Sequence, residues 1–295
     1  MKASVWPVLL LVVGGCTSIG DPDAELEDIE LVSMNGLSAN ALTANALTAN
    51  ALTANALTAN ALTANALTAN ALTANALDDP AQGEDAAEII RYSAKCMLRA
   101  DQYVDVTYRT AAGDLVSERY PGNLGLEPGW TSQGLSDLGR RWWGACLGAH
   151  VNALGISVPI SVRGPHPALE VGKKESAQFK ATREGAFYAD FNPTMTPPLH
   201  IYACWDAYSL SKIQMSNRLC ATQSCGPMFT VVGPCVDKNA QSDPKACEST
   251  KYPDSGTDHS TGNYFVRCHR QMGNPTWPDA SIVEAITTNL QTNPW

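Results

Sequence analysis

The sequence predicts an α+β fold: a single disulfide-rich domain preceded by a repetitive stalk. Residues 35–77 of the 295-residue chain carry no charge and repeat every five residues, and eight of the nine cysteines follow them. Beyond the repeat, helical and strand-like patterns mix without regular βαβ alternation. We therefore expect a signal peptide at 1–15, an acidic linker at 16–34, the repeat at 35–77 and a cysteine-rich body at 78–295.

The amino terminus has the order of a secretory signal. Lys2 supplies a positive charge, the mostly apolar run 5–13 follows, and Gly14 and Gly15 come next. A buried amino-terminal strand would not explain this order. The run is also too short to cross a bilayer core of about 30 Å as a helix. The sequence therefore predicts export.

Val13-Gly14-Gly15-Cys16 resembles the lipobox of bacterial lipoproteins, although leucine is commoner at the first position and alanine or serine at the second. The resemblance implies cleavage before Cys16 and acylation of that cysteine, so the membrane is a partner through the lipid. Thr17 stands where aspartate would signal retention in the inner membrane. The expected location is the outer membrane, on its periplasmic face or at the cell surface.

The net charge of −9 is concentrated in the linker. Residues 17–34 hold six acids and no base, whereas 78–295 hold 23 acids and 19 bases. A nucleic-acid-binding protein would show a basic patch or stripe, so this class is not expected.

The repeat unit Asn-Ala-Leu-Thr-Ala suits neither common element. Five residues advance an α-helix by about 500°, so the leucines scatter around its axis. An odd period also alternates them between the faces of a strand. The segment resembles the pentapeptide-repeat family, which implies a four-sided β-helix, but asparagine stands where that family has a small residue, as at Asn40. A low-complexity tether is the alternative, and either form makes a stalk. The recurring leucines are Leu37, Leu42, Leu47, Leu52, Leu57, Leu62, Leu67, Leu72 and Leu77.

An even number of cysteines remains when Cys16 is set aside. In an exported chain this predicts up to four disulfides, with 105 possible pairings. Zinc is the competing interpretation, but no Cys-x-x-Cys pair is present. The eight cysteines are Cys96, Cys146, Cys204, Cys220, Cys225, Cys235, Cys247 and Cys268.

The first half of the body shows local signals of both element types. Apolar spacing predicts a helix over 84–100, and alternation predicts strands at 103–109 and 115–120 joined as a hairpin. Ser136 can cap a helix running from 137 to about 154.

The second half continues with strands. Alternation predicts strands at 156–162, 187–191 and 200–205, and Pro159 suggests that the first is a sheet edge. A capping box at Ser281 predicts a short final helix.

Two groups of residues are candidates for catalysis. Cys146 and His150 lie four residues apart on one helix face, as a cysteine nucleophile and its base need, but a packing or disulfide role is the favoured interpretation of Cys146. Carboxylates for a glycosidase must lie about 5–10 Å apart, and nothing local fixes such a pair. These carboxylates are Glu170, Glu175, Glu184 and Asp190.

Trp142 and Trp143 are candidates for binding. They lie about 100° apart on one helix, so one of them is expected at a surface or groove, where it could bind a glycan or a protein.

The layout resembles surface lipoproteins of Gram-negative bacteria. No motif for a cofactor or a resident metal is present. We expect a lipid-anchored binding or structural lipoprotein of unknown ligand, and favour this over an exported hydrolase using a carboxylate pair or Cys146 and His150.

Overall fold

The computed structural model describes residues 32–37, 74–131, 134–179, 182–191, 199–220, 225, 228–235, 246–249, 264–269 and 281–291. The predictions for the signal peptide, for Cys16 and for repeat residues 38–73 lie outside these ranges. Within them, no helix is both long and apolar enough to cross a membrane.

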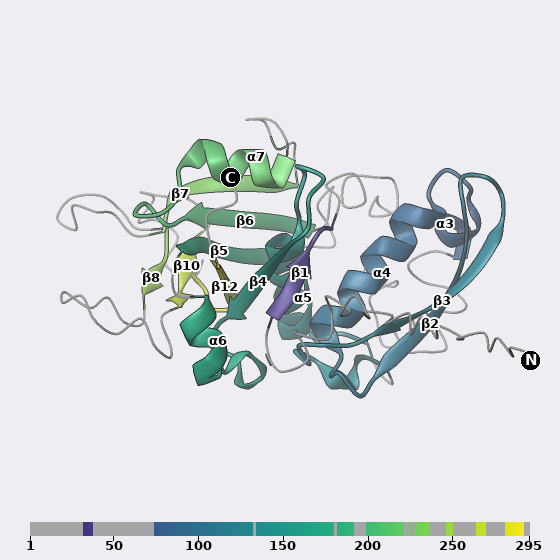
Figure 1. Cartoon of the computed structure of the whole chain (residues 1–295), viewed down its shortest axis with the longest axis horizontal. Coiled ribbons are helices and arrows are strands. Elements are labelled where there is room, and N and C mark those ends of the chain that lie inside the picture. The colour runs from purple at the N-terminus through teal and green to yellow at the C-terminus, as the bar shows by residue number, and fades with distance from the viewer. Residues whose placement is uncertain are drawn as a thin grey trace, which may run out of the picture.

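The fold is α+β and is built on a six-stranded mixed sheet with the order β1-β4-β12-β5-β6-β7 (Figure 1). Every neighbouring pair is antiparallel except β6 and β7, which are parallel. The strands are β1 (Val32–Asn35), β4 (Val158–Arg163), β5 (Thr182–Phe191), β6 (Leu199–Trp205), β7 (Phe229–Pro234) and β12 (Ala285–Leu290).

Helix α5 (Asp137–His150) packs across β5 and β6 on one face of this sheet. Its predicted cap is confirmed, because the Ser136 hydroxyl accepts a hydrogen bond from the Gly139 N–H at 2.9 Å. Gly144 allows the close approach, since a Cβ there would lie 2.5 Å from the Ala189 side chain. The helix ends at His150, before the predicted position.

The hairpin prediction is also confirmed. Strands β2 (Tyr103–Arg109) and β3 (Leu115–Pro121) pair along their length and pack with α3 (Ala74–Asp78) and α4 (Gly83–Met97) at one end of the molecule (Figure 1). The remaining elements are α6 (Lys173–Gln178), α7 (Lys212–Cys220), the 3-10 turns Pro128–Thr131 and Pro167–Leu169, β8 (Glu248–Ser249), β9 (Phe265–Val266), β10 (Cys268–His269) and β11 (Ser281–Ile282).

All eight cysteines of the body form disulfides, as the sequence predicts. One bond joins α4 to α5, one joins β6 to the residue after β7, one joins the last residue of α7 to the loop beyond it, and one connects the segment before β8 to β10. The pairs are Cys96–Cys146, Cys204–Cys235, Cys220–Cys225 and Cys247–Cys268.

The predicted final helix is wrong. Residues Ala285–Leu290 form β12, a strand with all six residues buried between β4 and β5. Its Ile-Thr-Thr sequence suits an extended strand covered on both faces, because β-branched side chains pack well there. This tertiary environment overrides the capping signal at Ser281.

Strand β4 is not at the sheet edge, contrary to the expectation from Pro159. Strand β1 covers it, with Met34 opposite Pro159. Proline is accommodated because β12 pairs with β4 only from Ile160 onward.

Residues 32–37 therefore belong to the globular body, although they fall in the ranges assigned to the linker and the repeat. Leu37, beyond β1, is fully buried. On the other side of the repeat, Ala76 and Leu77 of α3 are also buried in the same core. Both flanks of segment 38–73 are thus part of the body.

Candidate functional site

The predicted Cys146–His150 pair lies at the junction of α4, α5 and β1. The structure brings Cys146 and His150 together as expected, with 3.6 Å between Sγ and Nδ1, and adds the Cys96 sulfur at 3.9 Å. All three side chains are fully buried. The two sulfurs are bonded to each other, so Cys146 carries no thiol and the predicted cysteine nucleophile is not present.

The hydrogen bonds of His150 fix its tautomer. Nδ1 lies 2.8 Å from the Cys146 carbonyl oxygen, which can only accept, so Nδ1 carries the proton. Nε2 is then an acceptor, and the Ser33 hydroxyl of β1 donates to it at 2.7 Å. His150 thus connects the end of α5 to the strand that precedes the repeat.

His150 is also held in the neutral form. Burial lowers its pKa from 6.5 to about 3; the bond to the Cys146 carbonyl opposes this, and Lys95 and Arg218 lower it further. A general base works best with a pKa near the operating pH. Ser33 is itself 4% exposed. This Ser–His contact is therefore a structural link, and it supports no hydrolase chemistry. Ser33 was not among the predicted site residues. The sequence signal that could have identified it is its hydroxyl side chain four residues before Leu37.

Trp142 and Trp143 are both buried, at 4% and 2% exposure, so neither lies at a surface or groove as expected. Helix α5 contacts α4 as well as the sheet, so its buried stripe is broad enough for two neighbouring rings. Trp143 donates its indole N–H to the Ser93 hydroxyl of α4 at 2.8 Å, and Trp142 meets the His166 ring edge-on.

Two of the predicted carboxylates, Glu184 and Asp190, are too far apart for a catalytic pair. Glu184 and Asp190 lie six residues apart on β5, which corresponds to about 20 Å along a strand. Glu175 is buried on α6, whereas Glu170 is exposed. A glycosidase pair from Glu184 and Asp190 is excluded by this spacing.

Glu184 instead belongs to a buried ion pair. Its Oε1 lies 2.8 Å from Nε of Arg218 on α7, and both side chains are 0% exposed. The Thr288 hydroxyl donates to the other carboxylate oxygen at 2.6 Å. Arg218 also donates to the carbonyls of Gly148 and Ala149, in the last turn of α5. A cation there complements the negative end of the helix dipole. The pair therefore joins α7, β5, β12 and α5.

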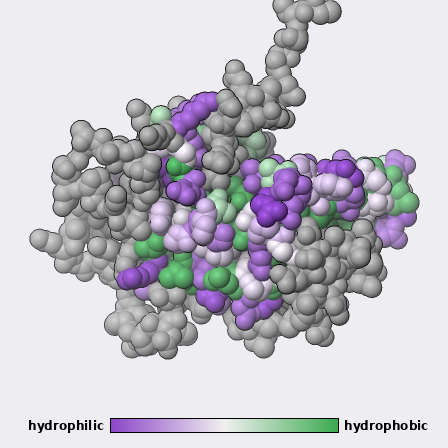
Figure 2. Space-filling model, turned by 90° about the horizontal axis from the view of Figure 1, so that it is seen from below, coloured by the Kyte–Doolittle hydropathy of each residue, from purple (hydrophilic) through white to green (hydrophobic). Residues whose placement is uncertain are grey.

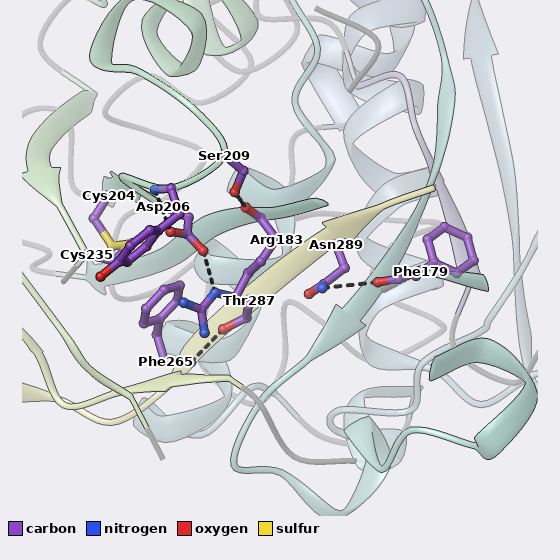
Figure 3. A network of polar contacts seen from close by, with 10 residues as sticks. Phe179, Arg183, Cys204, Asp206, Ser209, Cys235, Phe265, Thr287 and Asn289 are labelled. Atoms are coloured by element: carbon purple, nitrogen blue, oxygen red, sulfur yellow. Dashed lines mark hydrogen bonds and ion pairs between the residues drawn. A yellow bond between two sulfur atoms is a disulfide. The ribbon is translucent and has the colours of Figure 1, made fainter. Parts of the chain in front are cut away.

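A second ion pair, between Arg183 of β5 and Asp206 after β6, lies where the cysteine-rich segment meets the sheet. Figure 3 shows the Arg183 guanidinium between the Asp206 carboxylate and the Phe265 ring. Arg183 Nε donates to Asp206 at 2.6 Å, and its guanidinium carbon lies 4.3 Å from the ring centroid. The Phe265 N–H donates to the Thr287 hydroxyl of β12. The cation–π contact and the Phe265–Thr287 hydrogen bond thus hold β9 on the sheet, near the Cys204–Cys235 disulfide (Figure 3).

Two groups of metal-ligand types occur among the described residues. Cys96, Cys146 and His150 form one, and Cys204, Cys235 and Cys247 form the other, each with its donor atoms within 4.8 Å. The thiolate is the form of cysteine that binds metals. Every sulfur in both groups is in a disulfide, so neither group is a metal centre in this oxidation state.

The surface offers a mixed set of side chains. On the coloured part of the face in Figure 2, hydrophilic and hydrophobic residues are interspersed. The exposed face of the β2–β3 hairpin carries Tyr103, which is 48% exposed and lies under the Arg119 guanidinium at 3.8 Å.

Comparisons with known proteins give no assignment, because no family model, no curated protein and no solved structure matches this chain.

Proposed function

We propose that this protein is a lipid-anchored lipoprotein of the outer membrane, whose disulfide-stabilised body is a binding or structural module. The observation that carries the proposal is the use of the cysteines. Four disulfides take up all eight cysteines of the body, and the ninth is Cys16, directly after a signal-like apolar run. An oxidising compartment favours the bridges, and an acylated cysteine accounts for the odd one.

The neutral, enclosed His150 and the bridged Cys146 favour a non-catalytic role. Because β1 begins at residue 32, the tether between lipid and body is residues 17–31, which reach at most about 50 Å. The repeat then lies beyond the first strand of the body rather than between lipid and body.

Metabolic labelling in a Gram-negative host with an alkyne fatty acid tests the anchor. The wild-type chain and the neighbouring control Ser18→Ala should incorporate the label, and Cys16→Ala should not. Label that persists in Cys16→Ala would show that acylation occurs elsewhere and would refute the proposal.

A glycan array, probed with the full Cys16→Ala chain, tests the binding role. A sugar would stack on the face of the Tyr103 ring opposite Arg119, so Tyr103→Ala should weaken glycan binding by about tenfold, which is about 1.4 kcal/mol. Tyr208, which is 51% exposed, provides the control Tyr208→Ala. Equal binding by both variants would exclude the hairpin as the glycan site.

A further inference from the structure

The segment seated on the sheet edge has the pattern of the repeat. Residues 33–37 read Ser-Met-Asn-Gly-Leu, the next five read Ser-Ala-Asn-Ala-Leu, and each pentad from Thr43 onward reads Thr-Ala-Asn-Ala-Leu. All have a hydroxyl first, asparagine third, a small residue fourth and leucine fifth. An apolar residue precedes each, Val32 in the first and leucine in the others. Residues 33–37 are thus the first member of the repeat.

We call the seat of residues 33–37 the pentad groove; it is formed by the edge of β4, Ser157, His150 at the end of α5 and the two residues that follow it. Its main-chain contacts do not depend on side-chain identity. The N–H groups of Gly36 and Leu37 both donate to the His150 carbonyl at 3.1 Å, and the Asn152 N–H donates to the Leu37 carbonyl at 2.9 Å. Antiparallel pairing with β4 holds the first three positions. Such strand addition accepts any segment of compatible shape.

Side-chain contacts in the groove select two positions that every pentad shares. The Ser33 hydroxyl donates to His150 Nε2, and threonine or serine occupies this position in the others. The Leu37 side chain is 0% exposed in the core, and leucine closes every pentad.

The residue at the fourth position determines how well each pentad fits the groove. A Cβ on Gly36 would lie 2.9 Å from the Ser157 hydroxyl oxygen and 3.0 Å from the Tyr92 hydroxyl oxygen. Ser157 is exposed, so its hydroxyl can turn away, but the Ser157 Cβ at 3.2 Å and the hydroxyl of the buried Tyr92 require the bound segment to shift by a few tenths of an ångström. The alanine of a later pentad is therefore accommodated with a small displacement, and binds less well than the glycine of residues 33–37.

We infer that the groove is a recognition site for the pentad, and that repeat residues 38–42, or a later pentad of the same chain, can replace residues 33–37 in it. A shift by a whole repeat restores the hydroxyl, the asparagine, the small residue and the leucine at the first, third, fourth and fifth positions, whereas other shifts misplace the leucine. The adjacent pentad is covalently linked to the groove, so its effective concentration exceeds that of a second copy.

The exchange itself does not require the lipid. Its consequence rests on the proposed function: each step adds five residues, or at most about 17 Å, to the tether between Cys16 and the sheet. The repeat then supplies an adjustable length rather than a fixed stalk.

The test compares four full-length chains that all carry Cys16→Ala. The first has no further change, the second has Leu37→Asp, the third has serine at the seven central leucines (Leu42, Leu47, Leu52, Leu57, Leu62, Leu67 and Leu72), and the fourth combines both changes. Leu37→Asp expels residues 33–37 from the core. When the seven leucines are intact, a later pentad should replace residues 33–37, so Leu37→Asp should lower Tm by only about 2 °C. When these leucines are serine, the same change should lower Tm by about 10 °C. Hydrogen exchange in the Leu37→Asp chain should show protection lost at 33–37 and gained in the repeat, with the β4 edge still protected.

An equal fall in Tm from Leu37→Asp in both backgrounds would overturn the inference, as would a β4 edge that exchanges freely in the Leu37→Asp chain. Light scattering addresses the source of the pentad. A monomer supports replacement within the chain, and a dimer that forms only with intact pentads would overturn that assignment in favour of a second copy. Labelling at Cys16 is measured separately, so failure of the anchor and failure of the exchange remain distinct.

Discussion

Replacing Arg218 by methionine tests the buried ion pair most directly. The change leaves the Glu184 carboxylate at 0% exposure without its cation and removes the donors to the Gly148 and Ala149 carbonyls. Breaking a buried pair by removing one partner costs about 3–5 kcal/mol. For a body of this size that corresponds to a Tm lower by about 10 °C.

The double variant Arg218→Met/Glu184→Gln separates the charge from the packing. It removes the unpaired carboxylate, so only the two carbonyls of α5 and the cation–π contact with Phe187 remain lost, a cost of about 1–2 kcal/mol. In urea denaturation without reductant, the free energy of unfolding of the double variant should therefore lie between those of the wild type and Arg218→Met. Arg119→Met, which breaks the exposed pair with Asp105, is the control and should change little. A double variant no more stable than Arg218→Met would refute the assignment of the cost to the stranded Glu184 charge.

Three further predictions concern the Ser33–His150 hydrogen bond, the pKa of His150 and the disulfides. Ser33→Ala leaves His150 Nε2 buried without its donor and should cost about 1–3 kcal/mol in urea denaturation, whereas Ser33→Thr keeps the hydroxyl and should cost less. Because the folded pKa of His150 is about 3, the unfolded chain binds a proton below about pH 6.5 that the folded chain does not, so stability should fall by about 1.4 kcal/mol per pH unit as pH falls from 6.5 toward 3. In His150→Asn this contribution to the pH dependence of the free energy of unfolding should be absent. An unchanged pH dependence would contradict the lowered pKa of His150. Alkylation of the denatured, unreduced and unlipidated chain should modify Cys16 alone, and additional modified cysteines would contradict the four bridges.

Features set by local sequence could be predicted, and features set by distant residues could not. The hairpin 103–121 and the start of α5 at Ser136 depend on neighbouring residues, and both are confirmed. Strand β12 depends on β4 and β5, which lie more than 90 residues earlier, so its local capping signal was misleading. Strand β1 follows an acidic stretch, and its partner β4 lies beyond the repeat, so no local pattern marked it.

The candidate site was predicted in part. Helical spacing correctly placed Cys146 beside His150, because residues four apart share a helix face. The partner of Cys146 comes from α4, fifty residues earlier, and periodicity does not encode such a pairing. The same applies to Trp142 and Trp143, whose burial depends on α4 and the loop around His166 meeting α5. Arg218 and Glu184 meet only after α7 packs on the sheet.

The place of β12 in the sheet also determines when the body can fold. Strands β4 and β5 are made early but pair with β12 and not with each other, so the sheet is split until residue 290 has emerged. Folding that depends on such late, long-range pairing is slow. The two parts of the sheet, β1–β4 and β5–β6–β7, can therefore join only after nearly the whole chain has been synthesised. In the exported protein that we propose, the core would thus close after the chain has crossed the membrane.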